Sequence, residues 1–179
     1  SQIDGLNVEK ISDNAFKDNK NITSVTVNSG IKDIGASAFE NCTALATISL
    51  PDTIIHIGEK AIYNTAYYNN ASNWKPKSTQ SGSSSGGIQV GNGMESIPWE
   101  DIAAQNLDYL YLGTNLIEAT YSGSYAIKST TRVIADGAFS GCDAISVTLS
   151  SQLVTIGEKA FKDCKKLKTV KFFDSLEYI

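Results

Sequence analysis

The stretch IGASAFENC, residues 34–42, has four close copies elsewhere in this chain of 179 residues. The steps from Phe16 to Phe39 and from Phe39 to Ile62 are each 23 residues, and the step from Phe139 to Phe161 is 22. A fixed period of this size is typical of a solenoid, in which each repeat forms one coil that packs against its neighbours. The four copies are ISDNAFKDN (11–19), IGEKAIYNT (57–65), IADGAFSGC (134–142) and IGEKAFKDC (156–164).

A short alternating segment follows each copy and predicts a β-strand, as in SVTV (24–27) and TISL (47–50). A single strand with one apolar face cannot bury that face, but stacked coils pair their strands about 4.8 Å apart and join their apolar faces. The glycine of the Ile-Gly pair (Gly35, Gly58 and Gly157) predicts a sharp corner that a residue without a side chain accepts easily.

The period is interrupted in the middle of the chain, because Ile62 and Phe139 lie 77 residues apart, which is not a multiple of 23. We therefore predict two sets of coils, at 1–66 and 134–179, separated by an insertion at 67–133. The insertion is predicted to contain a mobile Ser/Gly-rich run (77–93), a short helix (97–105) and a β-hairpin (107–128) with a possible third strand at its end.

Composition excludes several classes of partner. The formal net charge of −4 argues against nucleic acid or an anionic membrane surface as the main partner. No run of 18 apolar residues is present, so we expect no insertion into a membrane. The N-terminus lacks the pattern of a signal peptide, which does not exclude secretion of a processed protein.

Residues with catalytic or metal-binding chemistry are few. His56 is the single histidine and occupies a variable position of the repeat, so we expect it at the surface. Cys42, Cys142 and Cys164 share one position of the repeat, which predicts small, buried, free thiols. No paired metal-ligand spacing and no base next to a cysteine is evident. The sequence therefore predicts no metal, no cofactor and no enzymatic activity.

The phrase Ile-Gly-x-x-Ala-Phe-x-x-Cys-x-x-Leu-x-x-Ile-x-Leu-Pro, carried by residues 34–51, resembles the leucine-rich repeats of BspA-type bacterial surface proteins. The resemblance covers about 8–65 and 134–179. Residues 65–74, 110–119 and 131–139 are also similar to a hairpin-bearing insertion of such arrays, whereas 75–106 is particular to this chain. The resemblance implies a right-handed, β-dominated β/α superhelix with parallel strands on its concave face. It also implies a secreted or cell-surface protein with an adhesive or binding role.

Candidate contact residues follow from the predicted outward-facing positions, from the lysine-rich last coil and from the aromatic insertion. Each group also has a structural interpretation: Ser and Thr pair well across strands, lysines solvate a face, and tryptophans can form a small core of the insertion. The candidates are Ser24, Thr26, Thr47, Ser49, Ser146, Thr148, Lys168, Thr169, Lys171, Trp74 and Trp99.

These features lead to the hypothesis of a non-enzymatic binding module that contacts a macromolecule, either a protein or a glycan, through its sheet face and its insertion. The alternative is a structural spacer with no ligand of its own. A glycan hydrolase would need a pair of convergent carboxylates, and the sequence offers no motif for one. The binding and spacer hypotheses would be distinguished by whether the full-length gene encodes many further coils and an anchoring signal.

Overall fold

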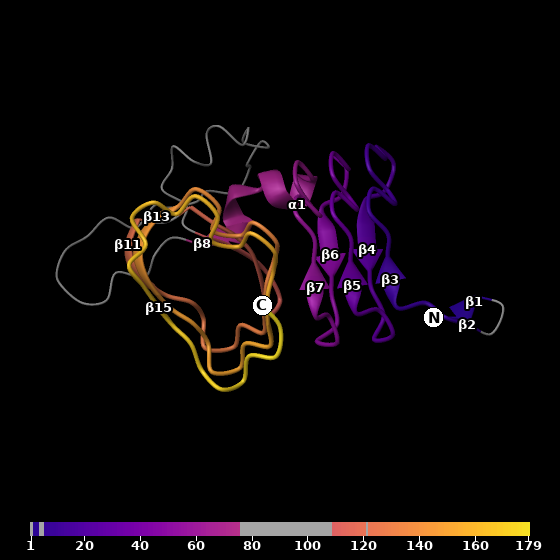
Figure 1. The fold of residues 1–179 in the computed structure, drawn as a ribbon. Helices are drawn as coiled ribbons and strands as arrows, with labels where there is room; N and C mark the ends of the chain where they lie inside the picture. Colours follow the sequence, from indigo (N-terminus) through magenta and orange to yellow (C-terminus); the bar gives the residue numbers. More distant parts are fainter. Residues whose placement is uncertain (1, 4–5, 76–108, 121) are drawn as a thin grey trace.

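The computed structural model describes residues 2–3, 6–75, 109–120 and 122–179. Its described part is a β-solenoid with little helix, in two arrays of stacked coils (Figure 1). The solenoid predicted from the 23-residue period is therefore confirmed, as is the leucine-rich-repeat fold that the resemblance implies. The predicted Ser/Gly-rich run at 77–93, the predicted helix at 97–105 and Trp99 lie outside the described residues.

Strands of successive coils pair in parallel in the first array. The pairs Ile11↔Ile34 and Ile34↔Ile57 each join equivalent residues of neighbouring coils, as do Val25 and Ile48 on the other side. One repeat is therefore one coil. The strands are β3 (Lys10–Ile11), β5 (Asp33–Ile34) and β7 (His56–Ile57) in one sheet and β4 (Ser24–Thr26) and β6 (Thr47–Ser49) in the other, after a short antiparallel pair, β1 (Gln2–Ile3) and β2 (Leu6–Asn7).

The second array repeats this arrangement but begins before residue 134. One sheet holds β10, β12 and β14, and β9 and β8 continue it on the β10 side, whereas the other sheet holds β11, β13 and β15. The bounds are β8 (Trp74–Lys75), β9 (Tyr109–Leu112), β10 (Asn115–Ala119), β11 (Ser122–Ala126), β12 (Val133–Ile134), β13 (Asp143–Thr148), β14 (Thr155–Ile156) and β15 (Thr169–Lys171).

The hairpin predicted at 107–128 needs a correction. β9 and β10 do form an antiparallel hairpin, but β11 pairs in parallel with β13 instead of joining it. β10 likewise pairs in parallel with β12. β10 and β11 thus supply the two strands of a coil that lacks the Ile-Gly-x-x-Ala-Phe phrase, so the repeated phrase does not reveal it.

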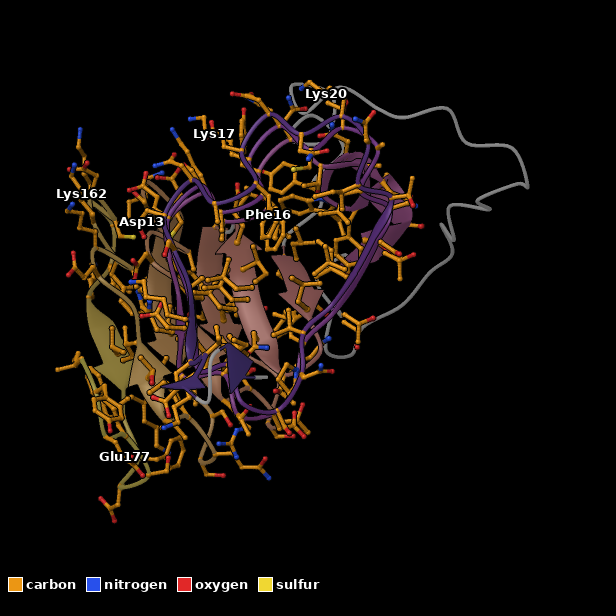
Figure 2. The ribbon with its side chains drawn as sticks, turned by 90° about the vertical axis from the view of Figure 1, so that its right-hand side faces the viewer. Asp13, Phe16, Lys17, Lys20, Lys162 and Glu177 are labelled. Atoms are coloured by element: carbon orange, nitrogen blue, oxygen red, sulfur yellow. The ribbon has the colours of Figure 1, made fainter. Side chains whose placement is uncertain are left out.

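Stacked phenylalanines fill the centre of each array. Phe39 and Phe139 are almost completely buried, and their ring centroids lie 5.2 Å from Phe16 and 4.9 Å from Phe161, respectively. Figure 2 shows Phe16 within the first coil, while Lys17 and Lys20 point away from its rim. Each ring covers the ring of the next coil, which joins the coils into a continuous apolar column.

The glycines of the Ile-Gly pairs allow the backbones of neighbouring coils to approach closely. A Cβ atom at Gly35, Gly58 or Gly157 would collide with the backbone of the preceding coil, at Asp13, Ala36 and Asp136 respectively. None of the three has a positive φ. Close approach of two backbones, and not the corner itself, therefore requires glycine here.

The three cysteines are free, as predicted. Cys42 and Cys142 are buried, whereas Cys164 is partly exposed in the last coil. The Sγ atoms of Cys142 and Cys164 lie 3.2 Å apart because the two residues occupy the same position in neighbouring coils. Burial is the largest cause that raises the pKa of Cys164, to about 12, and the adjacent thiol adds to it.

The two arrays point in different directions. Figure 1 shows the first array from the side and the second along its axis, with helix α1 (Ala66–Asn69) and the 3-10 turn η1 (Ala71–Asn73) after the third coil. The arrays meet at β7 and β12, where the Asp136 N–H donates to the Ile57 carbonyl at 2.9 Å. This junction brings the turn of the third coil next to the second array.

Candidate binding surfaces

Hydroxyl side chains form a regular row on the outer face of β4 and β6. Ser24 lies opposite Thr47, and Thr26 lies opposite Ser49. All four are exposed, while Val25 and Ile48 between them point inward. The parallel register aligns these hydroxyls because each coil places the same position at the same height.

A second row lies on β13 and β15, where Ser146 pairs with Thr169 and Thr148 pairs with Lys171. Ser146 and Thr148 are partly exposed, and Thr169 and Lys171 are exposed. The two rows belong to separate sheets in arrays that point in different directions. The structure therefore presents two short hydroxyl surfaces instead of one continuous face.

The last coil carries an exposed group of lysines that includes Lys168 and Lys171. Lys166 pairs with Asp143 at 2.8 Å, and Lys171 Nζ lies 5.3 Å from the centre of the Phe173 ring. These contacts are on the surface, where ion pairs stabilise a fold weakly.

Trp74, one of the candidate contact residues, belongs to a small core after the third coil. Its side chain is 3% exposed, its indole N–H donates to the Tyr68 carbonyl at 2.8 Å, and its ring meets the Tyr68 ring edge-on at 5.4 Å. A buried indole cannot touch a partner directly, so the structural alternative holds for Trp74. The Thr65 hydroxyl supports the same region by accepting from the Tyr68 N–H at 3.0 Å, at the start of α1.

His56, expected at the surface, is partly exposed and links the two arrays. Its Nδ1 lies 2.9 Å from Asp33 Oδ1, and its Nε2 lies 3.1 Å from Asp136 Oδ2. The hydrogen bond with Asp136 is the largest cause that raises the pKa of His56, to about 9, and the bond with Asp33 adds to it while partial burial opposes both. At neutral pH the ring is therefore an imidazolium that donates one N–H to each carboxylate.

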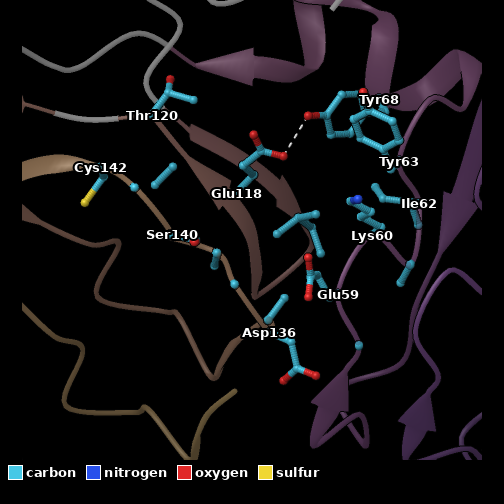
Figure 3. A pocket seen from close by; sticks show the side chains of 18 of the residues that line it. Glu59, Lys60, Ile62, Tyr63, Tyr68, Glu118, Thr120, Asp136, Ser140 and Cys142 are labelled. Atoms are coloured by element: carbon cyan, nitrogen blue, oxygen red, sulfur yellow. Dashed lines mark hydrogen bonds between the residues drawn. The ribbon is translucent and has the colours of Figure 1, made fainter. Parts of the chain in front are cut away.

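A cleft of about 540 Å³ lies beside this junction. One wall is the turn of the third coil with α1, and the other is formed by β10 and the turn after β12 (Figure 3). Polar and aromatic side chains converge on it from both walls, among them Lys60, Tyr63, Tyr68, Glu118 and Asp136. Its volume lies within the usual range of binding pockets in proteins.

Glu118 is the most unusual group in this cleft. The Tyr68 hydroxyl donates to Glu118 Oε2 at 2.7 Å, which joins the two walls. Burial raises the pKa of Glu118 above its usual value, although the hydrogen bond from Tyr68 opposes the shift. Burial is likewise the main reason that the pKa of Tyr68 is raised, and the carboxylate of Glu118 adds to it.

The cleft was not predicted from the sequence. One signal was present, since Glu118 is an acid within the largely apolar stretch NLIEA. Its partner Tyr68 lies 50 residues away, and neither residue belongs to the repeated phrase. Packing of the third coil against the second array creates the site, and the repeat carries no information about that contact.

The described residues contain no helix that is long and apolar enough to cross a membrane. Over the same residues, no three His, Cys, Asp or Glu side chains are grouped so that they could hold a metal ion.

Comparisons with known proteins give a family and several related folds. A model of the BspA type leucine rich repeat region matches six copies over residues 6–85 and 91–179, whereas the phrase around IGASAFENC occurs five times. No curated protein matches the chain. Its fold is similar to a leucine-rich repeat protein of T. pallidum, with 24% identity and a TM-score of 0.42 over 95% of this chain and 55% of that one.

Two further solved structures are similar. One is a leucine-rich repeat protein from Bacteroides ovatus, with 21% identity, a TM-score of 0.38, and coverage of 94% of this chain and 30% of that one. The other is a leucine rich cell surface protein from Faecalibacterium prausnitzii, with 19% identity, a TM-score of 0.38, and coverage of 97% and 54%. This chain thus spans between 30% and 55% of the length of these three proteins.

Proposed function

Because this chain belongs to the BspA-type leucine-rich-repeat family, we propose that it is a non-enzymatic binding module of a secreted or cell-surface bacterial protein. Its partner is a protein or a glycan, which it contacts through the two hydroxyl rows. The alternative is that the coils form a structural spacer that has no ligand of its own.

The observation that carries this proposal is the alignment of exposed hydroxyls along parallel strands. Ser24 and Thr47 stand side by side, as do Thr26 and Ser49, on a face that no other described element covers. Hydroxyls both donate and accept hydrogen bonds, so a row at a fixed spacing suits a repetitive polar partner. The fixed spacing of a parallel sheet also limits the ordering cost of binding.

The test is a binding screen of the chain against immobilised glycans and matrix proteins, followed by variants of the first row. Ser24→Ala, Thr26→Val, Thr47→Val and Ser49→Ala together remove four hydroxyls and preserve side-chain shape. We expect this variant to lose binding by about tenfold or more with an unchanged melting temperature. The matched control removes exposed hydroxyls elsewhere, through Ser29→Ala, Thr43→Ala and Ser151→Ala.

A partner that binds the row variant as well as the parent would place recognition elsewhere on the molecule. Failure to bind any glycan or matrix protein in the screen would favour the spacer. Equal losses in the row variant and the control would show a general effect of removing hydroxyls, and would also contradict the proposal.

A further inference from the structure

The charges around the cleft are not balanced. Among the described residues, four carboxyl groups line it, from Glu59, Glu118, Asp136 and Asp143, against one amine, that of Lys60. Asp136 is paired with His56 and Asp143 with Lys166. None of the ion pairs among the described residues includes Glu59 or Glu118. The cleft therefore keeps an excess of negative charge when Glu118 is ionised.

Glu118 is half-buried on the wall of the cleft, and one of its oxygens is engaged. Oε2 accepts from Tyr68, and no second hydrogen-bond donor to the carboxyl group is found within the described part of the chain. A recessed carboxylate costs free energy unless an ion or several donors satisfy it. The Glu118 carboxylate is therefore suited to accept a hydrogen bond from a positively charged group.

Tyr68 lies next to this carboxylate, and Tyr63 lies next to Tyr68. The rings of Tyr63 and Tyr68 meet edge-on with centroids 5.2 Å apart, and Figure 3 shows both on the wall of the cleft that Lys60 also lines. Lys60 Nζ lies 6.0 Å from the centre of the Tyr63 ring, so the cleft already places one ammonium near an aromatic face. Aromatic faces with a nearby carboxylate are a common way to hold ammonium and guanidinium groups.

We propose that this cleft binds a cationic side chain, a lysine ammonium or an arginine guanidinium, from a basic segment of a partner protein. Glu118 is the anion that the cation meets, and the partly exposed ring of Tyr63 is the aromatic wall. Tyr68 is buried and holds Glu118 in place through its hydroxyl. Lys60 competes with the incoming charge. The site serves the binding role proposed above and rests on it, since it makes the partner a protein.

The experiment uses the chain itself and a short probe, the peptide acetyl-Ala-Lys-Ala-amide, followed by NMR through the ring signals of Tyr63 and Tyr68. The neutral peptide acetyl-Ala-Gln-Ala-amide is the matched ligand control. We expect saturable shifts with the lysine peptide only. Glu118→Gln should weaken binding by about tenfold or more, because a charge-assisted hydrogen bond is lost, whereas Lys60→Asn should strengthen it. Asparagine suits the positive φ of 59° at position 60.

Glu177→Gln is the matched protein control, because it removes the same charge at an exposed position that does not line the cleft. The melting temperature supplies a second readout. A carboxylate present only to support the fold would make Glu118→Gln destabilising, whereas a carboxylate kept for binding leaves the variant as stable as the parent or more so. Affinity should also rise with pH as Glu118 loses its proton, over a range above the usual one for a glutamate because burial raises its pKa.

Equal binding of the lysine peptide to the parent and to Glu118→Gln would overturn the cation site, as would equal binding of the lysine and glutamine peptides. An absence of saturable shifts would also overturn it. So would a neutral oligosaccharide that shifts the same tyrosine signals and binds the Glu118→Gln variant as well as the parent. These outcomes leave the hydroxyl-row test intact, because the row variants do not touch the cleft. Conversely, the cleft could bind the lysine peptide selectively while the chain binds no glycan or matrix protein in the screen. That result would contradict only the role of the hydroxyl rows.

Discussion

Two positions in each repeated turn have positive φ. The second of them is always Asn, Asp or Gly, the residues that accept the left-handed region most readily. Asn41 also donates to Asp18 Oδ1, and Asn64 to Asn41 Oδ1, both at 2.8 Å, so the same residues link successive coils. The pairs are Asn14 and Asp18, Ser37 and Asn41, Lys60 and Asn64, Gly137 and Gly141, and Lys159 and Asp163.

Phe39 at the centre of the first array gives the first prediction. Phe39→Ala should lower the free energy of unfolding by roughly 3–5 kcal/mol, because the ring is buried and its neighbours cannot fill the space. Phe16→Ala should cost clearly less, since Phe16 is 42% exposed at the end of the stack. Urea unfolding of both variants measures the difference. Equal losses would mean that the two rings contribute alike in spite of their different burial.

His56 gives the second prediction at this scale. Folding raises its pKa from 6.5 to about 9, so the folded state binds the proton more tightly than the unfolded chain. The resulting stabilisation is complete below about pH 6.5 and is lost as the pH rises through about 9. We expect about 1 kcal/mol, allowing for solvent screening of a partly exposed ring.

Melting temperatures of the parent and of His56→Gln, compared across this range, test the expectation. Glutamine retains hydrogen bonding without the charge. The difference in melting temperature between the two proteins should therefore become smaller as the pH rises. A gap that widens or stays constant would show that the imidazolium does not stabilise the fold.

At the scale of the coil, the close contact between the backbones of neighbouring coils leaves no room for a side chain at the glycine of each Ile-Gly pair. Gly58→Ala should destabilise by roughly 1–3 kcal/mol, because its Cβ would press on the backbone of Ala36 in the preceding coil. Gly113→Asn is the control: nothing lies within 4 Å of a Cβ at that position, and asparagine tolerates its φ of 59°. Thermal melts of the two variants check this, and a melt of Gly58→Ala equal to the parent would refute the role of the close approach.

The coils were predictable to the extent that they repeat. The 23-residue period places Ile34 opposite Ile57 and Val25 opposite Ile48 without any knowledge of the structure. The coil at 115–126 was missed because its residues lack the Ala-Phe pair, although its strands pair with β12 and β13 like any other. Periodicity reports contacts between equivalent positions, so it cannot report a coil that departs from the pattern.

At the scale of the whole molecule, contacts between non-equivalent residues decide the shape, and these had no counterpart in the sequence pattern. His56 and Asp136 lie 80 residues apart, and Tyr68 and Glu118 lie 50 apart. The first pair joins the arrays at β7 and β12, and the second closes the cleft between them. The hydroxyls of β4 and β6 are exposed, as alternation along each strand predicts, whereas Ser146 and Thr148 on β13 are only partly exposed.

The junction itself can be tested with two isosteric changes. Asp136→Asn replaces Oδ2, the oxygen that accepts from His56, by an amide nitrogen, and retains Oδ1, which accepts from the Glu158 N–H at 2.7 Å. It should therefore weaken the link between the arrays and leave the second array intact. Asp33→Asn removes the other partner of His56, which lies in the same array as the histidine and also pairs with Lys10 at 3.4 Å. That variant should leave the link between the arrays in place.

Hydrogen exchange distinguishes the two variants. Since each coil of a solenoid is stabilised mainly by its neighbours, an array that loses contact with the next one opens more readily from that end. We expect faster exchange at the Asp136 N–H, which donates to Ile57, in Asp136→Asn but not in Asp33→Asn. Because both changes remove one negative charge beside the same imidazolium, a similar increase in the two variants would mean that charge near His56, and not the bond across the junction, holds the arrays together.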